Sequence, residues 1–306
     1  MHPFTRKSAD SVAAWGETTL LSAIRRWLGD TAPTAPSGMG DDCAVLRTGA
    51  RLVTVDPVIY GRHFDDKVSA CDAGAKLLKR NLSDLAAMGG RPTGAVIALA
   101  LDPRTRRDWL QEFYRGLAAV SRRHQVPIIG GDIAEGPGIN ATLTLLGEPT
   151  GKRVLTRTGA SLHDHIFVTG VLGGSLTSGH HHRFTPRLAE GAWLARQTAV
   201  RSMMDVSDGL AKDLKSLTPA GLFPAIAADQ LPCRRGVDVS AALTDGEDYE
   251  LLFTLAARTD AKAFARRWRA AFPRSRLTRL GRFERAGSHD ENSLRLECYH
   301  GFEHLH

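Results

Sequence analysis

The sequence predicts an α/β or α+β protein, and three observations support this fold class. Segments with strand-like and helix-like apolar spacing alternate along the chain. Apolar residues make up 42% of the sequence and charged residues 24%, which is the balance of a soluble globular protein. A length of 306 residues suits one large domain or two ordinary ones. Together these observations exclude a collagen, a long coiled coil and a wholly disordered chain.

The first predicted elements are a helix and a hairpin. Residues 17–28 are predicted to be helical because apolar residues recur there at helical spacing. Residues 29–40 are rich in Pro, Gly, Thr and Ser, which predicts a loop. Two short apolar runs, 43–46 and 52–55, flank Thr48-Gly49, and this pattern predicts a β-hairpin.

Helices and strands then alternate as far as residue 146. The predicted elements are helices at 72–88 and 104–124 and strands at 95–101, 126–129 and 141–146. Gly89-Gly90 ends the first of these helices, as glycine commonly does. The strand at 126–129 leads into Gly130-Gly131-Asp132, which we expect to be a loop.

A domain boundary is predicted near residues 148–151, because Glu-Pro-Thr-Gly is rich in turn formers. It separates an N-terminal domain, residues 1–148, from a C-terminal domain, residues 149–306. The second part carries predicted strands at 166–169, 251–256 and 277–283 and predicted helices at 189–198, 208–217 and 259–270.

Targeting signals and cysteine usage point to the cytoplasm. No stretch approaches the roughly 20 apolar residues of a membrane span. The charged N-terminus has no apolar run behind it, so no secretory signal is expected. The four cysteines are widely scattered and form no CxxC pair, which favours reduced thiols and a cytoplasmic protein.

The chain is basic, with a net charge of +7 and a pI near 9.5. Either the surface is simply rich in arginine or the protein binds anions such as nucleotide phosphates. Nucleic acid is the less favoured anion, because no basic stripe alternates with aromatic residues, which are only 7% of the chain.

The most informative chemical pattern is a set of aspartates in loops beside glycine, at the ends of apolar strands, or on a helix. They are Asp41, Asp42, Asp56, Asp84, Asp132, Asp205 and Asp208. Burying an unpaired carboxylate is costly. Mg²⁺ removes that cost, since it takes carboxylate oxygens and shares them with substrate phosphates. The set therefore favours a site for several metal ions and phosphate that draws on both predicted domains.

Each aspartate also has a structural interpretation. The pair at 41–42 could cap a turn, and Asp84 could pair with Lys79 or Arg80 on its own helix. Ser207-Asp208 could cap the helix that follows.

Motifs of other enzyme classes are missing from the sequence. It contains no GxxxxGK[ST] phosphate loop, no GxSxG elbow and no HRD-type kinase loop, and Gly38-Met39-Gly40 lacks the third glycine of a dinucleotide fingerprint. The triplet His180-His181-His182 could bind a transition metal. Without further spaced ligands, a surface loop is the favoured interpretation.

Several segments, in conserved order along nearly the whole chain, resemble the thiamine-monophosphate kinase family. That family belongs to the superfamily of aminoimidazole ribonucleotide synthetase and selenophosphate synthetase. The segments are GMGDDCAVL (38–46), TVDPVIYGRHF (54–64), KLLKRNLSDLAAMGGRP (76–92), GGDI (130–133), RTGA (157–160), MMDVSDGLAKDL (203–214), DGEDYELLFT (245–254) and GFEHLH (301–306). The NLSDLAAMG, DVSDGL and GEDYELLFT series is the most specific part of the resemblance.

The resemblance implies a two-domain aminoimidazole ribonucleotide synthetase-like fold. Its N-terminal domain would bind ATP and Mg²⁺ and dimerise through its sheet, and its C-terminal domain would be α/β. It also implies direct, in-line transfer of the γ-phosphoryl group of ATP to thiamine monophosphate, assisted by several Mg²⁺ ions. The acceptor is already a phosphate oxyanion, so no general base is expected.

The resemblance also implies roles for single residues. The implied Mg²⁺ ligands are Asp42, Thr54, Val55 (through its carbonyl), Asp56, Asp84, Asp132, Asp205 and Asp208. The implied ATP-binding residues are Gly131, Asp132, Arg157 and Ser207. The implied contacts to the thiamine substrate are His63, Glu247 and Phe302.

Three segments depart from the family pattern: 57–62, 163–165 and Asp245. They concern the acceptor side more than the metal side, so they leave the acceptor more open than the use of ATP. Two alternatives stay open. One is another ATP-dependent enzyme of the superfamily acting on a different small phosphorylated substrate. The other is a catalytically inactive, basic relative that binds anions or RNA.

Overall fold

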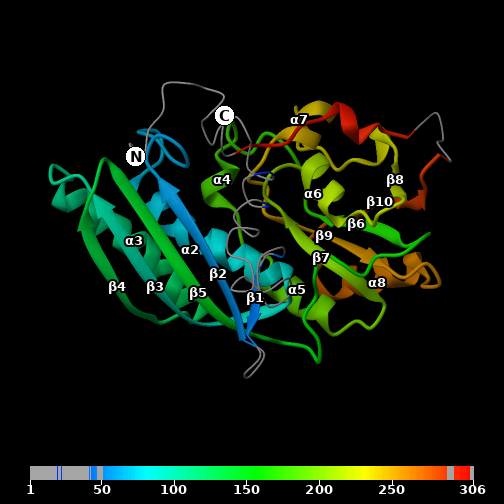
Figure 1. Cartoon of the computed structure of the whole chain (residues 1–306), viewed down its shortest axis with the longest axis horizontal. Helices are drawn as coiled ribbons and strands as arrows, with labels where there is room; N and C mark the ends of the chain where they lie inside the picture. Colours follow the sequence, from blue (N-terminus) through cyan, green and yellow to red (C-terminus); the bar gives the residue numbers. More distant parts are fainter. Residues whose placement is uncertain are drawn as a thin grey trace.

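The computed structural model describes residues 51–287 and 293–303, together with residues 19, 22, 41 and 43–46 of the preceding part. Within these residues the chain forms two five-stranded sheets with helices packed against them (Figure 1). The predicted helix at 17–28, the hairpin turn at 48–49 and Asp42 lie outside the described residues. The mixed architecture confirms the predicted fold class.

The first sheet is mixed, with one parallel pair. Its strands, in spatial order, are β1 (Ala44–Leu46), β2 (Arg51–Ile59), β5 (Ile139–Pro149), β3 (Gly90–Leu101) and β4 (Ile128–Glu135). Only the pairing of β3 with β4 is parallel; the other three are antiparallel. The predicted hairpin is confirmed by β1 and β2. β3 begins at Gly90 rather than at residue 95, because its first residues pair with the end of β5.

Strand β4 runs through Gly130-Gly131-Asp132, which the sequence wrongly predicted to be a loop. Asp132 pairs with Ala98 of β3. A Cβ added to Gly131 would lie 2.1 Å from the carbonyl oxygen of Ile97. The glycine therefore serves the close approach of two strands rather than a turn.

Helices α2 (Ala70–Ala87) and α3 (Arg107–His124) cover one face of this sheet (Figure 1). They touch through reciprocal glycines. A Cβ on Gly74 would lie 1.9 Å from a carbonyl oxygen of α3, and a Cβ on Gly116 would lie 1.8 Å from one of α2. Both predicted helices are confirmed, and Gly89 (φ +67°) ends α2 as expected.

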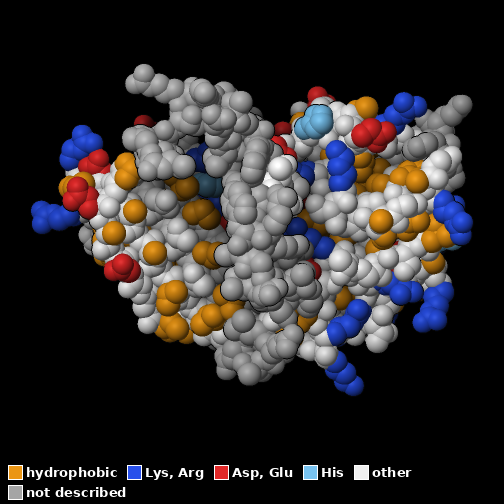
Figure 2. All heavy atoms as spheres, viewed as in Figure 1, with side chains coloured by type: hydrophobic (Ala, Val, Ile, Leu, Met, Phe, Trp, Pro, Cys, Tyr) orange, Lys and Arg blue, Asp and Glu red, His pale blue; other side chains and the backbone are white. Residues whose placement is uncertain are grey.

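The other face of the first sheet carries exposed apolar side chains. By strand register, Val55, Thr144 and Val96 form one row across this face. Val55 is 57% exposed and Val96 38%. Hydrophobic side chains are visible over this sheet in the left half of Figure 2. An apolar sheet face of this kind marks an interaction surface.

The second sheet is wholly antiparallel. Its strands, in spatial order, are β7 (Val200–Val206), β9 (Glu250–Leu255), β6 (His165–Thr169), β10 (Leu277–Arg285) and β8 (Leu222–Ile226). Strands β6, β9 and β10 were predicted. β7 and β8 were not, because polar residues interrupt the first and Pro224 lies within the second.

Both faces of the second sheet are covered. Helices α5 (Leu188–Ala195) and α8 (Ala261–Ala271) share a core with Phe167 and Phe253. Helices α6 (Leu210–Leu217) and α7 (Val239–Thr244) lie on the opposite side, in the core that contains Ile166 and Val168. This alternation along β6 explains why its run is almost continuously apolar. The shorter elements are α4 (His180–Arg183) and the 3₁₀ turns η4 (Ala228–Gln230) and η5 (Leu296–Cys298).

Helix α2 also contributes to a core of the second sheet. Ala86 and Ala87 pack with Phe167 and Leu194. A Cβ on Gly191 of α5 would lie 2.1 Å from the carbonyl oxygen of Ala86, so α5 and α2 are in direct backbone contact. The predicted boundary at 148/149 falls at the end of β5 and stays a prediction.

Two expectations about chemistry and targeting can be compared with the structure. All four cysteines lie among the described residues and are free thiols. In the described part of the chain, no helix has both the length and the apolar character needed to cross a bilayer.

Candidate active site

A cleft of about 200 Å³ lies between β2 and α2 on one side and the segments that follow β7 and precede β9 on the other. It is lined by Asp56, Arg62, His63, Arg80, Asp84, Leu176, Ser207, Asp208, Gly246, Glu247, Tyr249 and Phe302. Seven of the residues singled out from the sequence are among them: Asp56, His63, Asp84, Ser207, Asp208, Glu247 and Phe302. The structure thus brings together side chains that lie as much as 246 positions apart in the sequence, from Asp56 to Phe302.

One wall of the cleft carries carboxylates from β2 and α2. Alternation along β2 places Thr54 and Asp56 on the helix-covered side of the sheet and Val55 on the exposed side. The Thr54 hydroxyl donates to Asp84 Oδ2 at 2.6 Å. The Arg80 guanidinium lies 3.4 Å from Asp56 Oδ1 and donates to the carbonyl of Pro57 at 2.6 Å. Asp56 and Asp84 are therefore held side by side.

The second sheet adds carboxylates to this wall through the DVSDGL segment. Asp205, at the end of β7, is 1% exposed and accepts a hydrogen bond from the Ser83 hydroxyl of α2 at 2.6 Å. Asp208 lies in the turn before α6, 2.9 Å from Lys212 Nζ. Gly209 (φ +107°) follows, and α6 begins at Leu210 rather than at residue 208.

Asp213, which the sequence did not single out, fixes this turn. Its carboxyl accepts the backbone N–H groups of Ser207 and Asp208, each at 3.1 Å. Burial, followed by the negative charges of Asp208 and Asp205, raises the pKa of Asp213 well above its usual value. Burial is the main cause of the shift, and the neighbouring carboxylates add to it. In the sequence, Asp213 is simply a polar residue in the first turn of an amphipathic helix, so nothing there indicated its role.

Arg157 lies beside this group without lining the cleft. Its backbone N–H contacts the Asp41 carboxylate at 3.2 and 3.3 Å. The positive charge of Arg157 acts to lower the pKa of Asp213, so Arg157 lies near the acidic wall. The first aspartate of the GDD segment is therefore close to the RTGA segment.

Gly131 and Asp132 are not brought to the cleft within one chain. Both are exposed on β4, at the far edge of the first sheet from β1. Register connects Asp132 to Ala98, Thr142 and then Pro57, so three strand spacings, roughly 14 Å, separate it from β2. This row lies on the exposed face of the sheet, together with Val55 and Val96.

A second part of the cleft lining is formed by Glu247 and its partners, next to the acidic turn, since the Glu247 backbone N–H donates to the Ser207 carbonyl at 2.7 Å. Glu247 has a left-handed backbone (φ +64°), and its carboxylate lies 2.7 and 2.8 Å from Lys76 Nζ. Burial acts to raise its pKa, but the charges of Lys76 and Arg80 and the hydrogen bond from Lys76 outweigh burial, and the pKa of Glu247 falls to about 2. Glu247 is therefore a carboxylate at neutral pH. Lys76 and Arg80 are functional candidates that composition and spacing alone did not reveal.

His63, Arg62 and Phe302 complete this part of the lining. His63 is 9% exposed, and its Nδ1 accepts the backbone N–H of Ile59 at 3.1 Å, so Nε2 carries the hydrogen of the neutral ring. The Arg62 guanidinium lies 4.7 Å from the centroid of the Phe302 ring. The Phe302 backbone N–H donates to the Asp208 carbonyl at 2.8 Å, which ties the C-terminal segment to the acidic turn.

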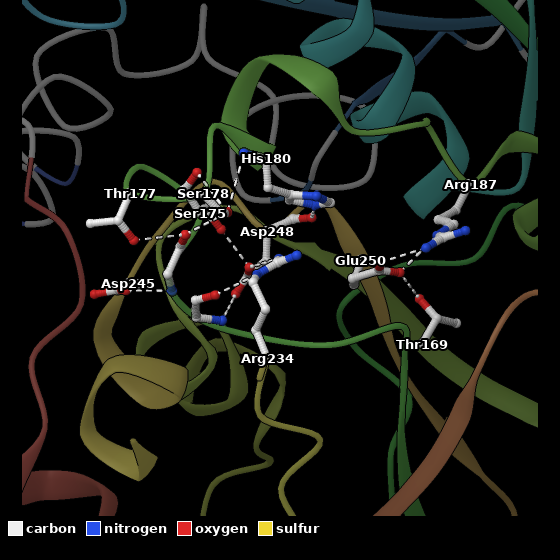
Figure 3. Close-up of polar contacts among 12 residues, drawn as sticks. Thr169, Ser175, Thr177, Ser178, His180, Arg187, Arg234, Asp245, Asp248 and Glu250 are labelled. Atoms are coloured by element: carbon white, nitrogen blue, oxygen red, sulfur yellow. Dashed lines mark hydrogen bonds and ion pairs between the residues drawn. The ribbon is translucent and has the colours of Figure 1, made fainter. Parts of the chain in front are cut away.

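A buried polar network behind Glu247 fixes the GEDYELLFT segment (Figure 3). Asp248 accepts the backbone N–H of Gly173 at 2.8 Å and the Ser175 hydroxyl at 2.5 Å. Glu250 accepts two hydrogen bonds from the Arg187 guanidinium, at 2.6 and 2.7 Å. Along this segment, Glu247 and Tyr249 line the cleft, whereas Asp248 and Glu250 hold the structure behind it.

The histidine triplet is not the surface loop that the sequence favoured. It forms the short helix α4, and His181 is 7% exposed. His181 Nδ1 lies 3.0 Å from Lys76 Nζ and 3.4 Å from Glu247 Oε2. Its partners come from α2 and the segment before β9, which are distant in sequence.

The acidic wall fits Mg²⁺ in its donor chemistry. Among the residues that the structure describes, no three His, Cys, Asp or Glu side chains form a ready-made metal cage. Mg²⁺ rarely requires one, because it keeps several waters and binds through one or two carboxylates together with substrate phosphates. Asp56, Asp84 and Asp208, which line the cleft, supply such oxygen ligands.

Comparison with known proteins identifies the family. Residues 40–148 match the family described as AIR synthase related protein, N-terminal domain. Thiamine-monophosphate kinase from Rhodopirellula baltica is 34% identical over 257 residues, which cover 79% of this chain and 79% of that protein. The enzyme of the same name from Salmonella typhimurium is 34% identical over 274 residues, covering 79% and 83%. The chain belongs to the thiamine-monophosphate kinase family. It is therefore a kinase by family.

Solved structures agree with this family. The structure described as AaThiL complexed with AMPPCP and TMP has a TM-score of 0.79 and 26% identity, covering 97% of this chain and 100% of that chain. Thiamine-monophosphate kinase from Stenotrophomonas maltophilia K279a has a TM-score of 0.69 and 32% identity, covering 90% and 96%. HypE from E. coli, a hydrogenase maturation protein, has a TM-score of 0.67 at 14% identity, covers 90% and 98%, and shows the fold alone. The expected aminoimidazole ribonucleotide synthetase-like fold is confirmed.

Proposed function

We propose that this protein transfers the γ-phosphoryl group of ATP to thiamine monophosphate and forms thiamine diphosphate. The observation that carries the proposal is the cleft, which gathers carboxylates from both sheets together with basic and aromatic side chains. Family membership and a similar protein whose structure holds AMPPCP, an ATP analogue, and TMP support the same reaction.

The acidic wall would hold the metal ions. Both substrates carry phosphate, so their mutual repulsion must be reduced before they can react, and bound Mg²⁺ supplies the positive charge for this. The ligands that we propose are Asp42, Thr54, Val55 (through its carbonyl), Asp56, Asp84, Asp205 and Asp208. Ser207 and Arg157 would contact ATP beside them. Transfer would be direct and in line, with no phosphoenzyme and no protein general base.

The second part of the lining would bind thiamine monophosphate. His63 Nε2–H and the Arg62 guanidinium offer donors for the acceptor's phosphate. Glu247 and Phe302 would contact the thiamine portion, whose thiazolium ring is cationic and suits a carboxylate and an aromatic face. The departures at 57–62 and Asp245 border this part of the lining, so they bear on acceptor choice.

We also infer that the protein works as a homodimer joined through the exposed face of the first sheet. Val55 and Val96 supply apolar surface there. Asp132 shares that face and lies across the sheet from its own chain's cleft, so we infer that Gly131 and Asp132 serve the partner's nucleotide. If so, mixing inactive Asp56→Asn and Asp132→Asn proteins during refolding restores part of the activity. No recovery, or a monomer by light scattering, contradicts the dimer.

The reaction itself is tested with purified protein, ATP, Mg²⁺ and thiamine monophosphate, and thiamine diphosphate is measured by chromatography. Thiamine and other phosphomonoesters serve as control acceptors. Product that requires both Mg²⁺ and thiamine monophosphate is the expected result. ATP turnover with another phosphomonoester supports a different superfamily reaction instead. RNA binding that weakens steeply with salt, without ATP turnover, supports an inactive binding protein.

A further inference from the structure

The proposed function leaves two buried features without a role, Lys76 and the histidine triplet. We propose that Lys76, backed by His181, is a positioning residue that fixes Glu247 and His63 for binding the phosphorylated acceptor. This inference rests on the proposed function for its kinetic test, and on geometry alone for its structural test.

The ammonium group of Lys76 has three hydrogens and meets three acceptors. They are the His63 carbonyl oxygen at 2.7 Å, Glu247 Oε2 at 2.8 Å and His181 Nδ1 at 3.0 Å. The side chain of Lys76 is 0% exposed. A fully buried lysine is tolerated only when it is paired and hydrogen-bonded. Here the Lys76 ammonium group connects Glu247 and His63, two of the residues predicted to contact the phosphorylated substrate.

His181 completes the arrangement on the side away from the cleft. Because Lys76 donates to its Nδ1, its Nε2 carries the ring hydrogen and donates to His182 Nδ1 at 3.1 Å. His180 Nε2 lies 3.0 Å from the Asp248 carbonyl oxygen, so it donates there and anchors α4 next to Glu247 (Figure 3). The triplet thus connects α2 to the segment that carries Glu247.

Glu247 needs such support because its backbone is strained. Glu247 and Tyr249 have positive φ angles of 64° and 53°, which non-glycine residues rarely adopt. Conformations of this kind persist only where the surroundings over-determine them. Lys76 comes from α2, which also carries Asp84. Its contacts therefore set the distance between the acceptor-binding part of the lining and the acidic wall.

The test compares Lys76→Met, which keeps the length of the side chain and removes the donors, with Lys79→Met. Lys79 lies on the same helix and donates to the His182 carbonyl at 3.0 Å, without touching Glu247 or His63. Lys76→Met is expected to raise the KM for thiamine monophosphate about tenfold or more, because three buried acceptors lose their donor. The KM for ATP is expected to change by less than about twofold, as are both constants in Lys79→Met.

A double variant separates positioning from general destabilisation. If Lys76 acts through Glu247, then Lys76→Met adds little to the acceptor KM of Glu247→Gln, whereas independent effects multiply. His181→Ala, which leaves two of the three acceptors of Lys76 in place, is expected to raise the same KM less than Lys76→Met does. Equal rises in both KM values, or multiplication in the double variant, overturn the proposal.

A crystal structure of the Lys76→Met protein provides the readout that does not depend on turnover. The Glu247 carboxylate and the His63 carbonyl are expected to move away from the positions described here. If both stay in place, the proposal is wrong even when activity falls. If wild-type protein makes no thiamine diphosphate but these groups move, the proposed function fails while the positioning role stands.

Discussion

Two pairs of carboxylates in this protein differ in the side chains that hold them. Asp84 and Asp205, on the acidic wall, accept hydrogen bonds from the hydroxyls of Thr54 and Ser83. Glu247 and Glu250 are instead held by the cations of Lys76 and Arg187. The two groups lie on neighbouring elements of one molecule, so the difference reflects their tasks rather than their surroundings.

A hydroxyl orients a carboxylate and leaves its negative charge in place, whereas a cation neutralises the charge. Carboxylates held by hydroxyls can therefore still attract metal ions. Those held by cations have their charge balanced within the fold, and Glu250, which lies away from the cleft, serves to fix the structure. Among these four carboxylates only Glu250 is away from the proposed chemistry, since Glu247, although paired with Lys76, lines the cleft.

The largest expected effect is the loss of turnover when a hydroxyl-held carboxylate is neutralised. Asp84→Asn is expected to lower kcat by more than about 100-fold, because a charged metal ligand is removed. The free energy of unfolding should not fall, since like charges nearby are relieved. Steady-state kinetics and urea unfolding measure the two effects. Normal turnover in Asp84→Asn contradicts the metal assignment.

Neutralising a cation-held carboxylate should have the opposite outcome. Glu250→Gln breaks the paired hydrogen bonds with Arg187, and we expect a loss of about 3 kcal/mol in the free energy of unfolding. The folded fraction should keep wild-type KM values, because Glu250 does not line the cleft. If Glu250→Gln keeps full stability but loses activity, the structural role of Glu250 is wrong.

Removing the hydroxyls sharpens the comparison further. Ser83→Ala removes one hydrogen bond that orients Asp205, and Thr54→Val removes the one that orients Asp84 together with a proposed metal ligand. The Mg²⁺ concentration needed for half-maximal rate is expected to rise about tenfold, as for other residues that orient metal ligands. A Mg²⁺ titration of each variant measures this. Thr105→Val, which removes a hydroxyl bonded to the Asp102 carbonyl far from the cleft, is the matched control.

The smallest effect concerns His180, which supports the structural group through Asp248. Burial lowers the pKa of His180 to about 4, below the usual 6.5. Its folded-state pKa is depressed, so its contribution to stability is present above pH 6.5 and is lost as the pH falls through 4. His180→Gln is therefore expected to lose about 1 kcal/mol less than wild type between pH 7 and pH 4.5 in urea unfolding. Equal losses in both proteins contradict this.

The sequence predicted most helices and the apolar strands of the second sheet, because their periodicity is set by burial on one or two faces. It missed β7 because that strand carries Asp205 and other polar residues for the cleft rather than a plain apolar run. It also placed Gly130-Gly131-Asp132 in a loop, because glycines beside an aspartate usually mark turns. Here they allow close pairing with β3.

The motifs placed Asp56, Asp84 and Asp208 at one cleft, since each motif is a local signal that survives without knowledge of the fold. Lys76 begins the KLLKRNLSDLAAMGGRP segment and His181 lies in the histidine triplet, but neither pattern indicated what these side chains do. Their role depends on contacts across 105 residues, which only the packing of α2 against the second half of the chain creates. The position of Asp132 could not be predicted from the sequence either, because it depends on the order of the strands in the sheet.

Helix α2 belongs to two cores at once, since its middle packs on the first sheet and its last turn on the second. Separating the chain at residue 148 would therefore strip one core of a shared wall and expose apolar surface on both pieces. We expect the two halves to unfold as one cooperative unit, with a single calorimetric transition. Heat or denaturant would then abolish the cleft in the same step as the fold, leaving no intermediate in which one sheet survives alone.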